Sequence, residues 1–143
     1  MKAIDITHQF RGYHADGGVC RIEVYTAPGL PPLVVATELP ENTNTSVTNL
    51  AEYLAAEVME RYLTADQLAG HDPPFVWVER YQRRQPHPTS GEHEDWSLVT
   101  FGHYRRELTR QNAPLGGWRY RIGDPDWRHL PREDFETLLA PYV

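Results

Sequence analysis

Hydrophobic residues follow two different periods along this chain. Between residues 46 and 63 they recur at steps of three and four, which predicts an amphipathic helix with one buried stripe. Elsewhere they alternate with polar residues or run together over short stretches, which predicts β-strands. The predicted strands are residues 20–26, 33–39, 75–81, 96–103 and 118–122. A short C-terminal helix is predicted to begin at Pro131, with Phe135, Leu138 and Leu139 turned inward.

The connections between these segments predict how the strands pair. Residues 28–32 form a short turn rich in proline and glycine, so the two strands around it are expected to be antiparallel. Residues 82–95 are polar and charged, which predicts an exposed loop within a long-looped hairpin. Residues 104–110 carry no clear pattern, and the turn signal at 123–126 ends the strand before it.

Together these elements predict an α+β fold. It consists of a mostly antiparallel sheet of about five strands, one long helix packed on it and a short C-terminal helix. The chain has 143 residues, which fits a single domain over residues 1–143 and suffices for a hydrophobic core without disulfides. The sequence contains no internal repeat and no segment that resembles a linker between domains.

Composition narrows the class of protein. Hydrophobic residues make up 40% of the chain and charged residues 24%, the range of a globular rather than a disordered protein. No apolar run approaches the roughly 20 residues of a membrane helix, and the N-terminus lacks the apolar core of a signal peptide. The single cysteine, Cys20, cannot form an internal disulfide. We therefore expect a cytoplasmic protein without membrane contact.

Charge is distributed unevenly along the chain. Lys and Arg number 14 against 20 Asp and Glu, a net charge of −6, and residues 1–78 account for the whole excess of acids. Only Lys2 is a lysine, and such a preference for arginine fits either bidentate anion binding or the codon bias of a GC-rich genome. The negative net charge argues against nucleic acid as a partner, because nucleic-acid binders carry a basic surface.

Three motifs carry a resemblance to a known family. They are Asn42-x-x-Thr45-Ser46-Val47-Thr48-Asn49 at the helix start, Trp77-Val78-Glu79-Arg80-Tyr81, and a Trp-x-Leu-Val-x-Phe pattern that begins at Trp96. Over residues 18–130 the chain resembles a family of small uncharacterised bacterial proteins. The resemblance implies a single bacterial domain and brings no activity, cofactor or site residue with it.

The start of the long helix is the first candidate site. Seven of the eight residues from 42 to 49 carry a hydroxyl or an amide, and a helix N-terminus presents free N–H groups with a partial positive charge. This combination predicts a site for a small molecule that bears phosphate or carboxylate. Its predicted ligands are Asn44, Thr45, Ser46, Thr48 and Asn49. The alternative interpretation is ordinary helix capping by one of these side chains.

Glu79 is the second candidate. It stands between Trp77 and Tyr81 on one face of a predicted strand. If that face is buried, Glu79 becomes a possible general acid or base. The alternative is an ion pair with a neighbouring arginine or a place at the solvated edge of the sheet.

Histidine and cysteine chemistry receives less support from the sequence. Histidines and acids gather within residues 82–95, but their spacing matches no zinc pattern, so we expect neither a metal nor a cofactor. Cys20 beside a histidine would make a nucleophile pair. Its alternative role is that of a small apolar residue in a buried strand.

Arginines interleave with aromatic residues near the C-terminus. This pattern is typical of surfaces that bind acidic protein partners or single-stranded nucleic acid, and also of a strand with an aromatic core face and a solvated arginine face. The predicted partner-binding residues are Arg83, Arg84, Arg119, Arg121, Trp127 and Arg128.

Two functions follow from these features. The first is a non-catalytic binding or protein-interaction module whose partner is another protein. The alternative is an enzyme or sensor that binds an anionic small molecule at residues 42–49, with Glu79 as the acid or base of the enzyme. A pocket that joins Glu79 to the helix start would favour the alternative, and an exposed apolar patch rimmed by arginines would favour the first.

Overall fold

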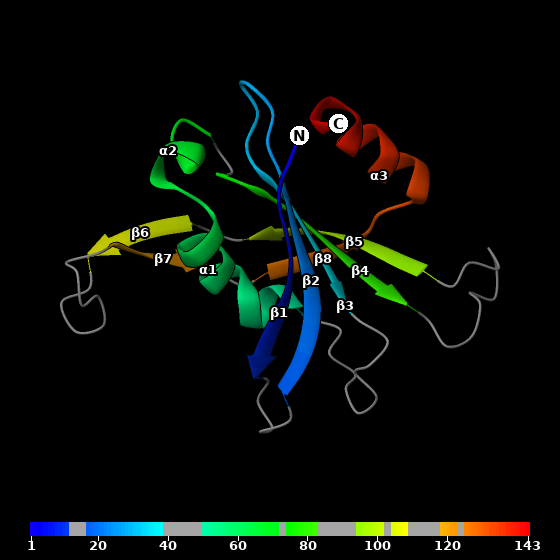
Figure 1. The fold of residues 1–143 in the computed structure, drawn as a ribbon, viewed down its shortest axis with the longest axis horizontal. Helices are drawn as coiled ribbons and strands as arrows, with labels where there is room; N and C mark the ends of the chain where they lie inside the picture. Colours follow the sequence, from blue (N-terminus) through cyan, green and yellow to red (C-terminus); the bar gives the residue numbers. More distant parts are fainter. Residues whose placement is uncertain are drawn as a thin grey trace.

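The computed structural model describes residues 1–11, 17–38, 50–71, 74–82, 94–101, 104–108, 118–122 and 125–143, and most of them lie in strands or helices (Figure 1). The strands are β1 (Lys2–Arg11), β2 (Gly17–Tyr25), β3 (Leu33–Glu38), β4 (Val76–Gln82), β5 (Glu94–Phe101), β6 (Tyr104–Leu108), β7 (Trp118–Ile122) and β8 (Pro125–His129). The helices are α1 (Leu50–Tyr62), α2 (Ala65–Leu68), α3 (Arg132–Leu139) and the 3-10 helix η1 (Ala140–Tyr142).

The main sheet has six strands in the order β1-β2-β3-β4-β5-β8. The antiparallel pairs predicted from the turns, β2 with β3 and β4 with β5, are confirmed. The pair of β3 and β4 is parallel, which the sequence did not predict. Parallel neighbours need a crossover connection, and here α1 and α2 lie between the two strands in the chain. The described fold is therefore α+β, with a mixed sheet of six strands in place of about five.

The ends of several strands differ from their predicted positions. β1, a strand of ten residues, was not among the predicted strands. β8 begins at Pro125, inside the turn signal expected to break the chain, because a proline at the first position of an edge strand removes only one N–H donor. β4 and β5 reach into the predicted loop, since Gln82 pairs with Glu94. The rest of that loop, residues 83–93, lies outside the described residues.

Helix α1 is described over 13 residues, whereas the sequence predicted a helix over residues 46–63. The predicted first turn lies outside the described residues, so a long helix is not evident. Within α1, Leu54 and Val58 are fully buried, as the predicted stripe requires. Burying a side chain of this size stabilises the fold by roughly 1.5–3 kcal/mol, which makes this stripe the main attachment of α1 to the sheet.

A capping box separates α1 from α2. The backbone N–H of Gln67 donates to Oγ1 of Thr64 at 3.1 Å, and the backbone N–H of Thr64 donates to Oε1 of Gln67 at 2.8 Å. These reciprocal bonds satisfy N–H groups that the first turn of a helix leaves free. They explain why the chain begins a new, short helix at this point.

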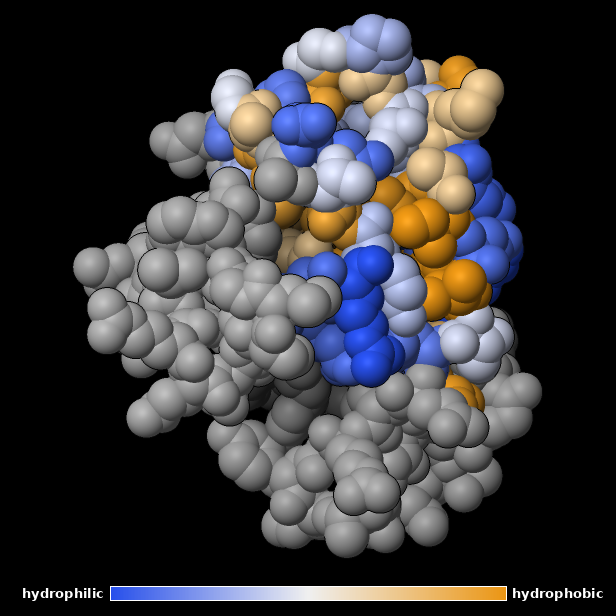
Figure 2. Space-filling model, turned by 60° about the vertical axis from the view of Figure 1, so that its left-hand side comes forward, coloured by the Kyte–Doolittle hydropathy of each residue, from blue (hydrophilic) through white to orange (hydrophobic). Residues whose placement is uncertain are grey.

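The described surface on the α1 side is mixed in character. Ile4 and Ile6 of β1 are only partly buried against the apolar residues beneath α1. Figure 2, in which the left-hand side of Figure 1 comes forward, shows apolar side chains next to strongly hydrophilic ones.

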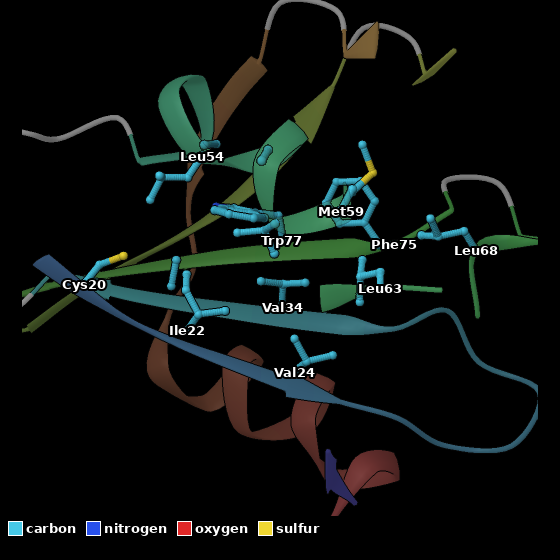
Figure 3. Close-up of a cluster of buried hydrophobic side chains, with 14 residues drawn as sticks. Cys20, Ile22, Val24, Val34, Leu54, Met59, Leu63, Leu68, Phe75 and Trp77 are labelled. Atoms are coloured by element: carbon cyan, nitrogen blue, oxygen red, sulfur yellow. The ribbon is translucent and has the colours of Figure 1, made fainter. Parts of the chain in front are cut away.

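Helices cover both faces of the main sheet. On the face toward α1, apolar side chains from α1, α2 and strands β2, β3 and β4 form one core cluster (Figure 3). Its largest fully buried members are Ile22, Leu54, Met59, Phe75 and Trp77. On the opposite face, α3 and η1 cover a second cluster that includes Leu33, Val35, Val78, Phe135 and Tyr142. Alternation along each strand divides its residues between these two clusters.

A second sheet consists of β6 and β7, which pair antiparallel. The predicted strand over residues 118–122 is confirmed as β7, although it belongs to this sheet and not to the main one. Part of the segment over residues 104–110 forms β6. β7 lies against α1, and Figure 1 shows the two strands extending beside α1, on the other side of the picture from α3.

Candidate functional site

Glu79 is fully buried, with 0% of its surface exposed. It lies on β4 two residues after Trp77, so both side chains point from the sheet toward α1. Burying an acid without partners is costly, which means that its neighbours must satisfy its oxygen atoms. The surroundings of Glu79 therefore decide what this residue can do.

Three N–H groups of the described residues donate to the Glu79 carboxylate. The indole Nε1 of Trp77 donates to Oε1 at 3.1 Å, and the indole Nε1 of Trp127 donates to Oε2 at 2.8 Å. The backbone N–H of Ala51 also donates to Oε1. All three groups are donors, and both oxygen atoms of the Glu79 carboxyl group act as acceptors.

The contact with Ala51 makes Glu79 a cap for α1. Ala51 is the second described residue of that helix, and its backbone N–H is directed at Glu79. The backbone N–H groups in the first turn of a helix have no partner within the helix. A negative charge at this end also interacts favourably with the helix dipole. In the described structure, the helix start thus receives its anion from the neighbouring strand β4.

This contact joins two features that the sequence singled out separately, the start of the helix and Glu79. The predicted anion ligands themselves lie outside the described residues; they are Asn44, Thr45, Ser46, Thr48 and Asn49. Their role stays a prediction. The role of Glu79 as an acid or base also stays a prediction, beside the capping role that its contacts assign.

A second polar cluster, which the sequence analysis missed, joins β1 to α1. His8 is 4% exposed; its Nδ1 lies 3.0 Å from the hydroxyl of Tyr62, and its Nε2 lies 3.4 Å from Oε2 of Glu57. Both ring nitrogens are therefore engaged, and the histidine fastens the edge strand to the helix. The available signal was the alternation from Ile4 to Ile6 and His8, which places the histidine on the buried face of β1.

Cys20 is the register partner of His8 across β1 and β2. Its side chain is buried, and this burial, together with the nearby Glu57 and Glu79, raises the pKa of the thiol to about 12. The thiolate is the nucleophilic form of cysteine, so a thiol with such a high pKa is a poor nucleophile. Its position supports the interpretation of Cys20 as a small apolar residue.

Charged residues on the other face of β1 and β2 pair with one another. Arg21 donates to both carboxylate oxygens of Asp5, at 2.7 and 2.6 Å, and this holds the pKa of Asp5 well below its ordinary value. Lys2 lies 3.2 Å from Asp5 and 3.1 Å from Glu23. Because each charge has an opposite partner, this network is a solvated ion-pair surface rather than a site awaiting a ligand.

The predicted partner-binding residues are only partly described. Trp127 and Arg128 lie on β8, the edge of the main sheet. Trp127 is half-buried, whereas the Arg128 side chain is 77% exposed and its Nε lies 3.1 Å from Asp126. Arg119 and Arg121 lie on β7, for which the structure describes the backbone. Arg83 and Arg84 lie outside the described residues.

Among the described residues, no three His, Cys, Asp or Glu side chains are grouped so that they could hold a metal ion. In the part of the chain that the structure describes, no helix is both long and apolar enough to cross a membrane.

Comparisons with known protein families, with curated proteins and with solved structures find no match. The resemblance to small bacterial proteins therefore stays a prediction. The candidate functions of this chain have to be argued from its own residues.

Proposed function

We propose that this protein is a non-catalytic protein-interaction module, and that it contacts its partner at the β8 edge of the main sheet. The exposed Arg128 on this edge strand carries the proposal. Arginine is enriched among the residues that contribute most to protein–protein binding, and the Arg128 side chain is 77% exposed.

The position of Trp127 supports this assignment. Its indole N–H is held by the buried Glu79, so the strand that presents Arg128 is tied to the core before any partner arrives. A contact surface that is ordered in advance loses less conformational entropy on binding. The burial of Glu79 supports the non-catalytic part, because a carboxylate held by three donors inside the core is not presented to a substrate.

Cross-linking of the tagged protein in its native cells, followed by mass spectrometry, tests the proposal. We expect a protein partner whose capture is lost in Arg128→Glu, since reversing a charge at a central contact costs about 2 kcal/mol of binding free energy or more. Arg132→Glu is the matched control. Arg132 is also exposed and also pairs with an acid on its own element, but it lies on α3. Equal capture by the wild-type protein and by Arg128→Glu would contradict a contact at β8.

A second candidate function is the binding of an anionic small molecule at residues 42–49. Its support is the crossover from β3 through α1 to the parallel strand β4, since ligands of parallel sheets bind beyond the carboxyl ends of the strands. Ala51 donates to Glu79 in the middle of β4, and Glu79 pairs with Ala36, which lies two residues before the carboxyl end of β3.

A thermal-shift screen against nucleotides, phosphorylated metabolites and carboxylates tests this second candidate. A ligand that binds only the folded protein must raise its melting temperature. We expect that increase to vanish in the double variant Ser46→Ala, Thr48→Ala, which itself should lose only about 1–2 kcal/mol of stability as the cost of a lost cap. A screen without any increase in melting temperature would count against this candidate and leave the interaction module ahead.

A further inference from the structure

The two-stranded sheet continues the edge of the main sheet in the same register. The pairing of β5 with β8 reaches Phe101 and Pro125, and the pairing of β6 with β7 starts at Tyr104 and Ile122. Two residues separate Phe101 from Tyr104, and two separate Ile122 from Pro125. The pairing of β6 with β7 therefore keeps the register of β5 with β8. β6 and β7, which we call the ribbon, thus extend the edge pair β5–β8 beyond the main sheet to a position beside α1.

The ribbon has the opposite charge to the rest of the protein. Its ten residues contain four arginines and one glutamate, a net charge of +3. The other 133 residues contain ten bases and 19 acids, a net charge of −9. The structure therefore concentrates positive charge on an extension of an acidic protein.

The register also places like charges opposite each other. Arg105 is the partner of Arg121, and the next pair on that face is Glu107 with Arg119. Opposite residues of an antiparallel pair share a face with Cβ atoms about 4.5–5.5 Å apart, and like charges there destabilise the pair. Arg105 and Arg121 thus bring two positively charged residue types to one register position, where an anionic group would find both.

We propose that the ribbon binds an acidic segment of a partner protein through Arg105, Arg119 and Arg121. This inference rests on the proposed function, to which it adds the binding element and the chemistry of the partner. Carboxylate groups match the planar guanidinium group of arginine, which binds them through two parallel hydrogen bonds.

The charges favour an acidic segment over two other occupants. A nucleic acid carries charge along its whole length and would also meet the acidic remainder of the molecule. A second copy of this chain would bring together two molecules that each have a net charge of −6. A short acidic segment can contact the ribbon without contacting the acidic remainder of the molecule, so it meets less electrostatic repulsion than either of the other two occupants.

Fluorescence anisotropy with a labelled peptide of alternating glutamate and serine tests the inference on the full chain. We expect binding that weakens as salt is added, and that falls by roughly tenfold or more in Arg119→Glu and in Arg121→Glu. Arg132→Glu on α3 makes the same change in net charge outside the ribbon and should bind like the wild-type protein. A peptide with glutamine in place of glutamate should not bind.

Arg121→Gln keeps the test decisive if charge reversal unfolds the ribbon. This variant removes one positive charge without introducing a negative one, so its melting temperature should stay near that of the wild-type protein while peptide binding weakens. No binding of the acidic peptide, tighter binding of single-stranded DNA, or self-association in sedimentation that depends on Arg119 and Arg121 would each overturn the inference. If the peptide fails to bind while Arg128→Glu still loses its cross-linked partner, the ribbon is excluded and the proposed function stands.

Discussion

At the scale of single residues, Glu79 connects three parts of the chain that are distant in sequence. Its two tryptophan donors lie on β4 and β8, and its third donor is the backbone of α1. Placing an ionised carboxylate in the core costs several kcal/mol unless hydrogen bonds replace the lost water. The three donors provide that replacement, so Glu79 fixes the start of the helix and the edge strand at the same time.

Replacing Glu79 tests this role. Glu79→Gln keeps the size of the side chain but turns an acceptor oxygen into an NH₂ group that faces N–H donors. We expect unfolding in urea to show a loss of about 1–3 kcal/mol, the cost of leaving buried polar groups unsatisfied. Glu136→Gln, at an exposed position on α3, should stay within about 0.5 kcal/mol of the wild-type protein. Equal stability of the two variants would contradict the capping role of Glu79.

The raised pKa of the Cys20 thiol predicts how the free energy of unfolding changes at alkaline pH. Burial raises the pKa of its thiol from 9.0 to about 12, so between these values the unfolded chain loses the proton and the folded protein keeps it. The stability that Cys20 contributes is therefore present below pH 9.0 and is lost as the pH rises toward 12. Urea unfolding over this range should show the wild-type protein losing up to about 1.4 kcal/mol per pH unit more than Cys20→Ala. Tyr25, whose pKa burial also raises to about 12, is present in both proteins and cancels in the comparison. Parallel stability curves would exclude this effect of Cys20.

Residue patterns in the sequence located these two side chains but not their partners. Alternation put Glu79 beside Trp77 and Cys20 among apolar residues. However, Trp127 lies 48 residues after Glu79 and Ala51 lies 28 residues before it. Contacts over such distances depend on strand order and on the docking of α1, neither of which a local pattern contains.

At the scale of elements, the apolar period predicted the buried stripe of α1, and alternation predicted the middle of most strands. The ends of the elements were less predictable. Pro125 looked like a break and instead begins β8, because an edge strand tolerates a missing N–H donor. The segment over residues 104–110 had no clear pattern. Residues 104–108 form β6 because they pair with β7.

At the scale of the whole molecule, the mixed sheet brings the candidate features together. The crossover between β3 and β4 sets α1 over β4, so that the helix start meets Glu79. The edge position of β8 exposes Arg128, and the continued register carries the arginines of the ribbon beyond the sheet. The proposed contacts thus lie at one edge of the main sheet, on β8 and on the ribbon that extends it.

The sequence by itself determined the α+β class, the buried stripe of α1, the antiparallel pairs β2–β3 and β4–β5, and the place of Glu79 beside Trp77 on one face of a strand. These features are local, since each depends on residues a few positions apart. The tertiary structure decided the parallel pairing of β3 and β4, the capping of α1 by Glu79 and the joint register of β5–β8 and the ribbon. These features depend on which distant segments become neighbours, and that choice follows from burying both faces of one sheet at once.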